Sequence, residues 1–390
     1  MKQKQYILVV NAGSSTIKFQ ILHQDEFKVA LKGIFERIGL NNSFYNIEEN
    51  SSKRIIAKNF PAGIKTHGQA LSIVIKKISH WQRKIKSVGH RVVHGGEEFI
   101  KPTIINKTIL KRLKNYNQLA PLHNPINLSC LAVCLDKFSQ EVKNIAVFDT
   151  AFYKNIPDYA YMYALPFDYY KKYNIRRYGF HGISHQYVAE QAAEKLKKPL
   201  TKLKLITCHL GSGSSITATR FGQAIETSMG FTPLEGLTMG TRSGDVDPAA
   251  VLYLMKKLNI GSAEMEEILN KKSGLLGIFG YSNDMRDVMS AAGYKISGYQ
   301  VRRKFNQKER KRAQLALKMF IYDIRRYIGS FATILGGVDA IVFTAGIGER
   351  NSTVRRLITN NLKLNQKYKI LVIPTNEELM IAKEVSKLVR

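Results

Sequence analysis

Two segments far apart in the chain repeat one pattern: an apolar strand, a turn rich in glycine and serine, and a second strand. In the first segment, the apolar run Tyr6–Val10 leads into Asn11–Ser15, and the alternating stretch Thr16–Leu22 follows. In the second, Lys204–Thr219 carries the same order around the turn Gly211–Ser215. A repeat at this distance indicates a duplicated domain rather than a solenoid, whose units recur every roughly 20–50 residues.

Strands and helices alternate along the rest of the chain, which predicts an α/β fold. Further strands are expected at Val88–Val93, Ile145–Phe148, Ala340–Thr344 and Ile370–Ile373, and helices at residues 69–80, Ala313–Ile328 and Glu377–Leu388. The 390 residues exceed the size at which one hydrophobic core usually stops growing. We therefore expect one domain from residues 1–150 together with the helix at about 375–390, and a second from residues 151–374.

The chain is strongly basic. Sixty Lys and Arg residues against 30 Asp and Glu give a formal net charge of +30, which indicates anionic partners: nucleic acid, an anionic membrane or small anions. Three cysteines are too few for a disulfide framework, and no run reaches the roughly 18 apolar residues of a membrane helix. A soluble, cytoplasmic protein is expected, with the basic runs Lys195–Lys204 and Arg302–Arg312 on its solvated surface.

Three glycine-rich turns, at residues 11–15, 211–215 and 345–348, each follow an apolar strand. Glycine lets backbone N–H groups approach an anion closely, and neighbouring hydroxyls add donors. The chain has no G-x-x-x-x-G-K-[ST] motif, and Gly211-x-Gly213 lacks the third glycine of a dinucleotide fingerprint. The turns favour a two-lobed nucleotide binder that holds phosphates with hairpins from both lobes.

Two arginines have surroundings in which a solvated side chain is uncommon. Arg91 interrupts an apolar strand, and Arg242 lies in the glycine-flanked stretch Gly240–Gly244. A planar guanidinium that binds a carboxylate or phosphate through two parallel hydrogen bonds suits both places. For either arginine alone, an internal ion pair is an equal alternative. Together with the glycine turns, anion binding is favoured.

These segments together resemble the acetate kinase family. Asn11–Lys18 (N-A-G-S-S-T-I-K) and Tyr178–His185 (Y-G-F-H-G-I-S-H) are similar to its two signatures. Further similar stretches are His90–Gly96, Pro121–Pro125, Val147–Phe152, Met229–Arg242, Asn283–Asp287, Phe343–Glu349 and Pro374–Glu378. The resemblance spans the whole chain in order. It implies two duplicated actin-like (ribonuclease H-like) domains with a nucleotide cleft between them, in agreement with the repeat.

The resemblance also implies an activity and its partners. Such a kinase transfers the γ-phosphoryl group of ATP to acetate, reversibly, giving acetyl phosphate and ADP, a step of acetyl-CoA biosynthesis. It would use Mg²⁺, with Mn²⁺ as an alternative, and act as a homodimer. Neither a specific nucleic acid nor a membrane is expected as a partner.

Site roles follow from the same resemblance. The catalytic residues would be Arg91, His123, Asp149, His181 and Arg242. The metal would be held by Asn11 and Glu377, and the acetate methyl group would lie among Val93, Leu122, Phe180 and Pro233, with Arg91 on the carboxylate. The nucleotide-binding residues would be Lys18, His209, Leu210, Gly211, Ser212, Gly213, Asp284, Met285, Arg286, Gly346, Ile347, Gly348, Glu349 and Arg350.

The expected chemistry requires no general base. The nucleophile is a carboxylate, already ionised at neutral pH because its pKa lies near about 4.3. Phosphoryl transfer depends on positioning and on stabilisation of charge, which suits two clamping arginines and a histidine supported by His123. Asp149 is therefore interpreted as positioning either the waters of Mg²⁺ or a clamp arginine, not as a proton acceptor.

Alternatives remain open. Propionate kinase on the same fold is the nearest, because an apolar pocket discriminates one methylene by only roughly 1–3 kcal/mol. Val93, bulkier than the alanine expected in a pocket for propionate, favours acetate. A basic nucleotide- or nucleic-acid-binding protein without kinase activity is the alternative from another class. Ser212 and Arg350 depart from the common family pattern, and the sequence leaves the effect of both open.

Overall fold

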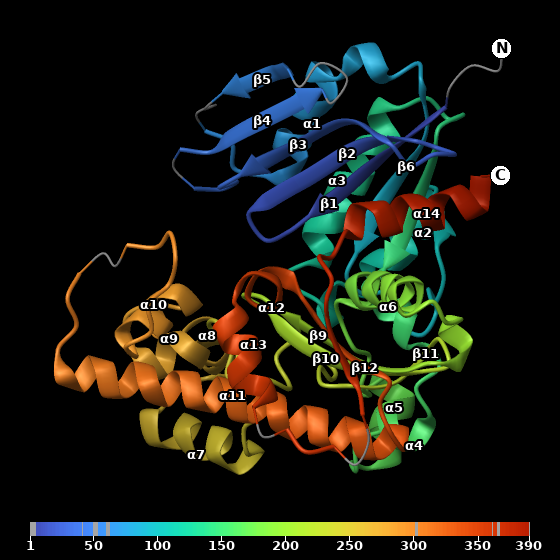
Figure 1. Cartoon of the computed structure of the whole chain (residues 1–390). Helices are drawn as coiled ribbons and strands as arrows, with labels where there is room; N and C mark the ends of the chain where they lie inside the picture. The colour runs from blue at the N-terminus through green and yellow to red at the C-terminus, as the bar shows by residue number, and fades with distance from the viewer. Residues whose placement is uncertain are drawn as a thin grey trace. The chain divides into compact units, whose positions relative to one another are not determined.

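The computed structural model describes residues 5–40, 42–49, 54–59, 63–300, 303–360, 362–364 and 367–389 (Figure 1). The chain folds into two compact units. Unit 1 comprises residues 1–154, 182–184 and 376–390, and unit 2 comprises residues 155–181 and 185–375. The boundaries expected after residue 150 and at about residue 375 lie close to these limits, whereas the sequence does not predict that residues 182–184 belong to unit 1.

Unit 1 contains an eight-stranded sheet in the order β5-β4-β3-β2-β1-β6-β8-β7. Its strands are β1 (Tyr6–Ala12), β2 (Thr16–His23), β3 (Val29–Glu36), β4 (Phe44–Glu49), β5 (Arg54–Asn59), β6 (Ile85–Val92), β7 (Thr103–Ile104) and β8 (Lys143–Phe148). Its helices are α1 (His67–Lys77), α2 (Lys107–Lys114), α3 (Asn124–Lys137) and α14 (Glu377–Val389), with the 3₁₀ turns η1 (Ser79–Trp81), η2 (Asn117–Leu119) and η3 (Asp149–Tyr153).

Unit 2 contains a five-stranded sheet in the order β11-β10-β9-β12-β13. Its strands are β9 (Lys204–Leu210), β10 (Ser214–Arg220), β11 (Gln223–Thr227), β12 (Ala340–Thr344) and β13 (Lys369–Val372). Its helices are α4 (Asp158–Tyr161), α5 (Phe167–Tyr173), α6 (Gly182–Leu196, whose first three residues are in unit 1), α7 (Pro248–Leu258), α8 (Ser262–Lys271), α9 (Gly274–Phe279), α10 (Met285–Ala291), α11 (Gln307–Leu335), α12 (Ala345–Arg350) and α13 (Ser352–Thr359), with the 3₁₀ turn η4 (Leu200–Lys202).

The two sheets share one topology. In unit 1, β1 pairs antiparallel with β2 and β2 with β3, while β6 and β8 continue the sheet in parallel on the other side of β1. In unit 2, β9, β10, β11, β12 and β13 repeat the same order and directions. The duplicated α/β fold expected from the repeated strand–turn–strand segments is therefore confirmed.

Strand alternation decides which way each side chain of β1 faces. Leu8 and Val10 are buried in a hydrophobic core with side chains of α1 and α3. Because successive side chains point to opposite faces of a strand, Asn11 faces the other side, where α14 packs on β1 and β6. A Cβ atom on Gly89 of β6 would lie 2.7 Å from Ile381 of α14, so this close packing requires glycine. The polar end of β1 is thus directed toward the start of α14.

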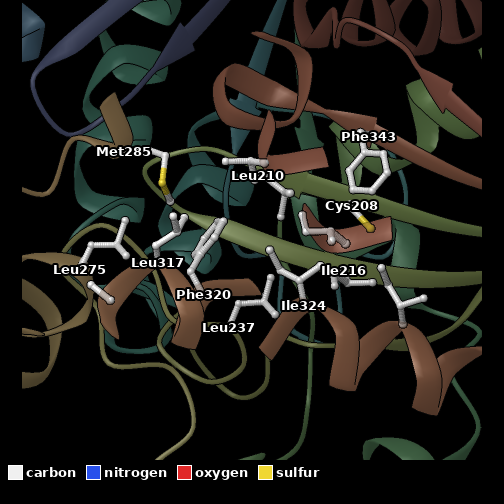
Figure 2. Close-up of a cluster of buried hydrophobic side chains, with 14 of the residues drawn as sticks. Cys208, Leu210, Ile216, Leu237, Leu275, Met285, Leu317, Phe320, Ile324 and Phe343 are labelled. Atoms are coloured by element: carbon white, nitrogen blue, oxygen red, sulfur yellow. The ribbon is translucent and has the colours of Figure 1, made fainter. Parts of the chain in front are cut away.

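The sheet of unit 2 has two chemically different faces. Cys208, Ile216 and Phe343 pack against Phe320 of the long helix α11 (Figure 2). On the other face, Thr207 of β9 and Ser215, Thr217 and Thr219 of β10 carry buried hydroxyl groups, and His185 of α6 is hydrogen-bonded to Thr207 and Ser215 there. The apolar face stabilises the unit, and the hydroxyl-bearing face contributes to the candidate site.

The two basic runs behave differently. Most of the side chains in residues 195–204 are exposed, as expected for solvated surface. In the second run, whose Arg302 lies outside the described residues, Arg303 forms an ion pair with Glu309 (2.5 Å), and Arg312 donates from Nε to the backbone oxygen of Ile278 (2.6 Å). Some of the excess positive charge therefore stabilises local structure. Across the described part of the chain, no helix combines the length and apolarity needed to cross a membrane.

His90, which is buried in β6, should make the folded protein less stable at acidic pH. Burial lowers the pKa of His90 to about 4, although its hydrogen bond from Nε2 to Asn144 Oδ1 (3.0 Å) opposes the shift. Between pH 6.5 and 4 the unfolded chain binds a proton that the folded chain does not, so the free energy of unfolding should fall by up to about 3 kcal/mol as the pH is lowered through this window. Denaturant titrations of wild type and His90→Gln should show a shallower acid slope in the variant. The exposed His80→Gln is the control, and equal slopes in wild type and His90→Gln would contradict the assignment.

Candidate active site

In unit 1, polar side chains gather where β1 meets the start of α14. Asn11 donates from Nδ2 to Glu377 Oε2 and to Glu378 Oε1, both at 2.9 Å. Asn11 is buried, and Glu378 is only 9% exposed. The end of one strand and the first turn of the C-terminal helix, far apart in sequence, thus form one cluster.

Arg91 joins this cluster from β6. Its Nε (3.1 Å) and Nη2 (2.7 Å) both donate to Oδ2 of Asp149, which follows β8. Its Nη1 donates to Asn11 Oδ1 at 3.2 Å and lies 3.3 Å from Glu377 Oε2. The ion pair that the sequence left open is therefore present for Arg91, and both Asn11 and Glu377, the predicted metal ligands, contact this arginine.

Burial and charge act in opposite directions on this pair. Burial lowers the pKa of Arg91, but the carboxylates of Asp149 and Glu377 outweigh it, so the pKa is raised and the guanidinium stays charged. Burial raises the pKa of Asp149, while the charge of Arg91 opposes that shift. Asp149 is 1% exposed, whereas 16% of the Arg91 side chain is accessible. The carboxylate is thus enclosed, and the arginine retains an accessible part.

The chemistry of the donors around Arg91 permits a test for a divalent metal. Asn11, Glu377 and Glu378 supply oxygen atoms, and the buried Oδ1 of Asp149 accepts neither of the two hydrogen bonds from Arg91. Oxygen donors suit Mg²⁺. Within the same described ranges, no three histidine, cysteine, aspartate or glutamate side chains are grouped so that they alone could hold a metal. The residues fit an ion that keeps waters and phosphate oxygens in its shell, as Mg²⁺ commonly does.

Lys18 lies on the same sheet beside this cluster. It pairs with Asn11 in the register of β1 and β2, so the two side chains share a face. Lys18 is exposed and, with Gln20, Lys32 and Glu378, lines a hollow of about 300 Å³. Its ammonium group is therefore accessible at the edge of the cluster.

In unit 2, His181 stands over the glycine turn between β9 and β10. It adopts a left-handed backbone conformation (φ 57°) immediately before α6, and its ring stacks on His209 with centroids 4.3 Å apart. A Cβ atom on Gly213 would lie 3.4 Å from His181 Nε2 and 3.6 Å from Arg242 Nη1. Gly213 therefore leaves the space in which the histidine and the arginine both approach the turn.

Arg242 differs from Arg91 in its partners. Its Nη1 donates to the backbone oxygen of Pro233 at 3.2 Å, and no carboxylate in the described part of the chain forms an ion pair with it. Burial lowers the pKa of Arg242, but a guanidinium remains protonated at neutral pH. For Arg242, the structure favours anion binding over an internal ion pair.

A half-buried network holds the loop that supports Arg242. Arg177 Nη2 lies 2.9 Å from Glu235 Oε1, and the hydroxyl of Tyr163 donates to the other oxygen of Glu235. Tyr163 in turn accepts a hydrogen bond from the backbone N–H of Phe231 (2.8 Å). These contacts fix the chain on both sides of Pro233. Sequence patterns alone gave no indication of this network.

The predicted nucleotide residues of unit 2 are brought together in part. A Cβ atom on Gly240 would lie 3.4 Å from Ser212 Oγ and 3.6 Å from Asn283 Cβ, and one on Gly211 would lie 3.7 Å from Ala345 Cβ. The turn at residues 211–213 is thus adjacent to the starts of α10 and α12.

Several of these residues have contacts inside the protein. The side chains of Leu210 and Met285 lie in the hydrophobic core (Figure 2), so only their backbone atoms can face a ligand. Asp284 caps α10 by accepting from the backbone N–H of Arg286 (2.8 Å) and pairs with its guanidinium (2.6 Å). Glu349 Oε1 accepts from the backbone N–H groups of Ala345 (2.8 Å) and Thr375 (3.0 Å).

The glycine-rich turn predicted at residues 345–348 is wrong. These residues begin α12, which follows β12 directly, and Ala345 takes a left-handed conformation (φ 63°). The carboxylate of Glu349 binds the N–H of Ala345 and thereby stabilises this short helix. Gly346 and Arg350 are exposed, Ile347 is half-buried and Gly348 is buried.

The residues predicted to surround the acetate methyl group belong to both units. In unit 1, Val93 is 5% exposed and donates its N–H to Asn127 Oδ1 (3.1 Å), while Leu122 is 42% exposed. In unit 2, Phe180 is buried and Pro233 is half-buried. His123, predicted to support His181, lies in unit 1 immediately before α3 and is half-buried.

A duplicated actin-like sheet with arginine, histidine and glycine-turn groups of this kind defines a phosphotransferase of the kinase class. The model of the Acetokinase family matches residues 6–365. A protein from Caldicellulosiruptor saccharolyticus named acetate kinase is 45% identical over 98% of this chain and 99% of its own length. The chain belongs to the acetokinase family.

Two solved structures are also similar. The acetate kinase of Porphyromonas gingivalis superposes with a TM-score of 0.85 at 34% identity, covering 99% of this chain and all of its own. A propionate kinase from Francisella tularensis gives a TM-score of 0.85 at 36% identity, covering 97% of this chain and 98% of its own. The family resemblance and the fold inferred from the sequence motifs are confirmed.

Proposed function

We propose that this chain is an acetate kinase, which transfers the γ-phosphoryl group of ATP to acetate and gives acetyl phosphate and ADP reversibly. The observation that carries the proposal is the half-buried guanidinium of Arg242, which has no ion-pair partner in the described residues and lies beside His181 at the glycine turn. A positive charge with this geometry suits an anion, and a transferring phosphoryl group supplies one. The homologous acetate kinases support the choice of acceptor.

The proposed reaction is a single in-line displacement without a phosphoenzyme. A carboxylate oxygen of acetate attacks the γ-phosphorus, the new O–P bond forms as the bond to the bridging oxygen breaks, and the electron pair leaves with ADP. Arg91 binds the acetate carboxylate, and Arg242 and His181 stabilise the equatorial oxygens, with His123 in support. No proton has to be removed, because acetate is already ionised.

We assign Asp149 the role of positioning Arg91, the arginine that binds acetate. Of the two roles that the sequence left open, this one is supported by the two hydrogen bonds from Arg91 to Asp149 Oδ2. A bound Mg²⁺, or alternatively Mn²⁺, would be held by Asn11 and Glu377 and would neutralise phosphate charge. Glu378, which shares the amide of Asn11, is a further candidate for the same site.

The nucleotide is proposed to bind through both side chains and backbone. Lys18 is accessible to phosphate in unit 1. In unit 2, the backbone of residues 209–213 and the segments Asp284–Arg286 and Gly346–Arg350 would contact ADP and ATP. Ser212 and Arg350 would contribute, respectively, a short hydroxyl donor and an exposed charge.

Propionate is the second candidate acceptor, because a propionate kinase superposes as well as an acetate kinase does. If Val93 limits the pocket, Val93→Ala should raise the ratio of kcat/KM for propionate to that for acetate by about 10-fold, within the range expected for one methylene. Val133→Ala, a half-buried valine of α3 outside the predicted pocket, is the matched control. An unchanged ratio in folded Val93→Ala would show that Val93 does not limit the acceptor pocket.

A hydroxamate assay tests the proposed activity. Purified protein with ATP, MgCl₂ and hydroxylamine should form acetyl hydroxamate with acetate, and should do so more efficiently than with propionate. A higher kcat/KM for propionate than for acetate would instead identify the protein as a propionate kinase. Absence of both products, with retained ATP binding, would support a nucleotide-binding protein without kinase activity.

We further propose a cytoplasmic homodimer. Helix α7 exposes Leu252 (59%), Tyr253 (63%) and Leu258 (54%), an apolar surface that a second copy would cover. Sedimentation equilibrium should give twice the chain mass, and Leu252→Glu should produce the monomer. Leu40→Glu, at an equally exposed leucine (59%) of unit 1, should not. A monomeric wild type would exclude the dimer.

A further inference from the structure

A chain of hydrogen bonds runs behind His181 across the hydroxyl-bearing face of the unit 2 sheet. His181 Nδ1 lies 2.9 Å from Ser215 Oγ, which lies 2.8 Å from His185 Nε2. On the other side of that ring, His185 Nδ1 lies 2.7 Å from Thr207 Oγ1. Ser215, His185 and Thr207 are all fully buried. The side chain assigned to the phosphoryl group is thus connected to three buried groups that the mechanism does not use.

Proton counting restricts how these groups can be arranged. Ser215 has one hydroxyl proton, so it donates to one ring and must accept from the other. Burial lowers the pKa of His185 well below the ordinary histidine value, so its ring is neutral and carries a proton on one nitrogen only. Each hydrogen bond in the chain therefore determines the direction of the next.

The hydrogen bond made by Thr207, the last group in this series, sets the direction of the other hydrogen bonds. Thr207 Oγ1 donates to the backbone oxygen of Thr217 at 3.4 Å, which leaves it to accept from His185 Nδ1. His185 Nε2 then carries no proton and accepts from Ser215. Ser215 in turn accepts from Nδ1 of His181. The proton of His181 is thereby held at Nδ1, on the side facing the sheet.

We propose that Thr207, His185 and Ser215 are positioning residues that hold a proton on Nδ1 of His181, so that a second proton at Nε2 makes the ring a charged donor to the phosphoryl group. Nε2 lies on the side of Gly213 and Arg242, 3.4 Å from where a Cβ on Gly213 would be. The neutral ring offers only a lone pair at Nε2, so the donor to the phosphoryl oxygens is the ring that has taken a second proton there, while Ser215 still accepts from Nδ1. The inference rests on the proposed function for the identity of the anion, and the proton order itself does not depend on it.

The surroundings of His181 agree with this order. The ring of His209 covers one face of His181, and the guanidinium of Arg242 lies beside Gly213. Neither the stacked ring nor the guanidinium, which has only donors, can accept the Nδ1 proton in place of Ser215. Ser215, 2.9 Å from Nδ1, is the acceptor to which the proposal assigns this proton.

The variant Thr207→Val tests the proposal without touching His181. Valine is nearly isosteric with threonine but cannot accept from His185 Nδ1, so the His185 proton should move to Nε2 and reverse both bonds of Ser215. Nitrogen-15 NMR of histidine-labelled protein, with the His181 signals assigned by their loss in His181→Gln, should show protonated Nδ1 in wild type and protonated Nε2 in the variant. The value of kcat should fall by at least about 10-fold with KM for ATP within about twofold, because Ser215 would then donate to Nδ1 and oppose the charged form of His181, which leaves a weaker, neutral donor at the phosphoryl group.

Controls separate this role from a structural one. Thr207→Ser keeps the hydroxyl and should retain the wild-type nitrogen pattern and kcat. Thr219→Val removes another buried hydroxyl from the same face of β10, one without a hydrogen-bond partner in the described residues, and should change neither readout. If Thr207→Val does not fold, Ser215→Ala provides the same test, since it removes the acceptor at Nδ1 directly.

Two results would overturn the proposal: a wild-type His181 protonated only at Nε2, or an unchanged His181 nitrogen pattern in folded Thr207→Val. Failure of the proposed function would look different. Wild-type protein would then show the predicted nitrogen pattern but form no acetyl phosphate.

Discussion

Arg242→Ala should lower kcat by roughly 10³-fold, the effect expected when an arginine that stabilises a transferring phosphoryl group is lost. The half-buried guanidinium is oriented by the backbone oxygen of Pro233 and forms no ion pair within the described residues, so its charge is available to an anion. Steady-state kinetics in both directions, with circular dichroism to establish folding, would measure the effect.

Two further variants define the role of Arg242. Arg242→Lys restores a charge but not the planar fork, and should recover only part of the lost turnover. Arg220→Ala, at an exposed arginine that ends β10, should be close to wild type. Near-native turnover of folded Arg242→Ala would refute the clamp assignment.

Asp149→Asn should also lower kcat by about 10²–10³-fold, because it releases Arg91. The carboxylate is enclosed and accepts hydrogen bonds from both Nε and Nη2 of Arg91, so its replacement leaves a half-buried guanidinium with less compensation. Breaking one side of such a pair commonly costs about 3–5 kcal/mol of stability, and we expect the lower end because Glu377 stays close to Arg91.

A double-variant cycle distinguishes positioning from an independent role of Asp149. If the carboxylate acts only through Arg91, Arg91→Ala combined with Asp149→Asn should be no slower than Arg91→Ala alone. Losses that multiply, to roughly 10⁵-fold or more, would show that Asp149 acts on the reaction in another way.

Much of the fold could be predicted because local patterns determine it. The apolar run before residue 11 and the alternation at residues 16–22 are sufficient to indicate β1 and β2, and the same pattern at residues 204–219 indicates β9 and β10. The start of α12 was missed because A-G-I-G has the composition of a turn. Its helix depends on the carboxylate of Glu349, a contact that glycine content does not reveal.

The partners within the site could not be predicted to the same extent. The sequence leaves the same two alternatives open for Arg91 and Arg242, yet Arg91 forms an ion pair while no ion pair of Arg242 is found in the described residues, since the difference depends on the distant residues Asp149 and Glu377. One signal for the chain behind His181 was present. The hydroxyl side chains of Ser215, Thr217 and Thr219 alternate with apolar ones, which places them on one buried face.

Phosphorus-31 NMR of wild-type protein with ATP, Mg²⁺ and acetate, without a trapping reagent, tests the central claim most directly. A kinase that transfers the γ-phosphoryl group in line should produce acetyl phosphate and ADP in equal amounts and approach equilibrium from either direction. It should release inorganic phosphate much more slowly than it forms ADP. ADP formed together with inorganic phosphate, or no turnover at all in folded protein that binds ATP, would contradict the account.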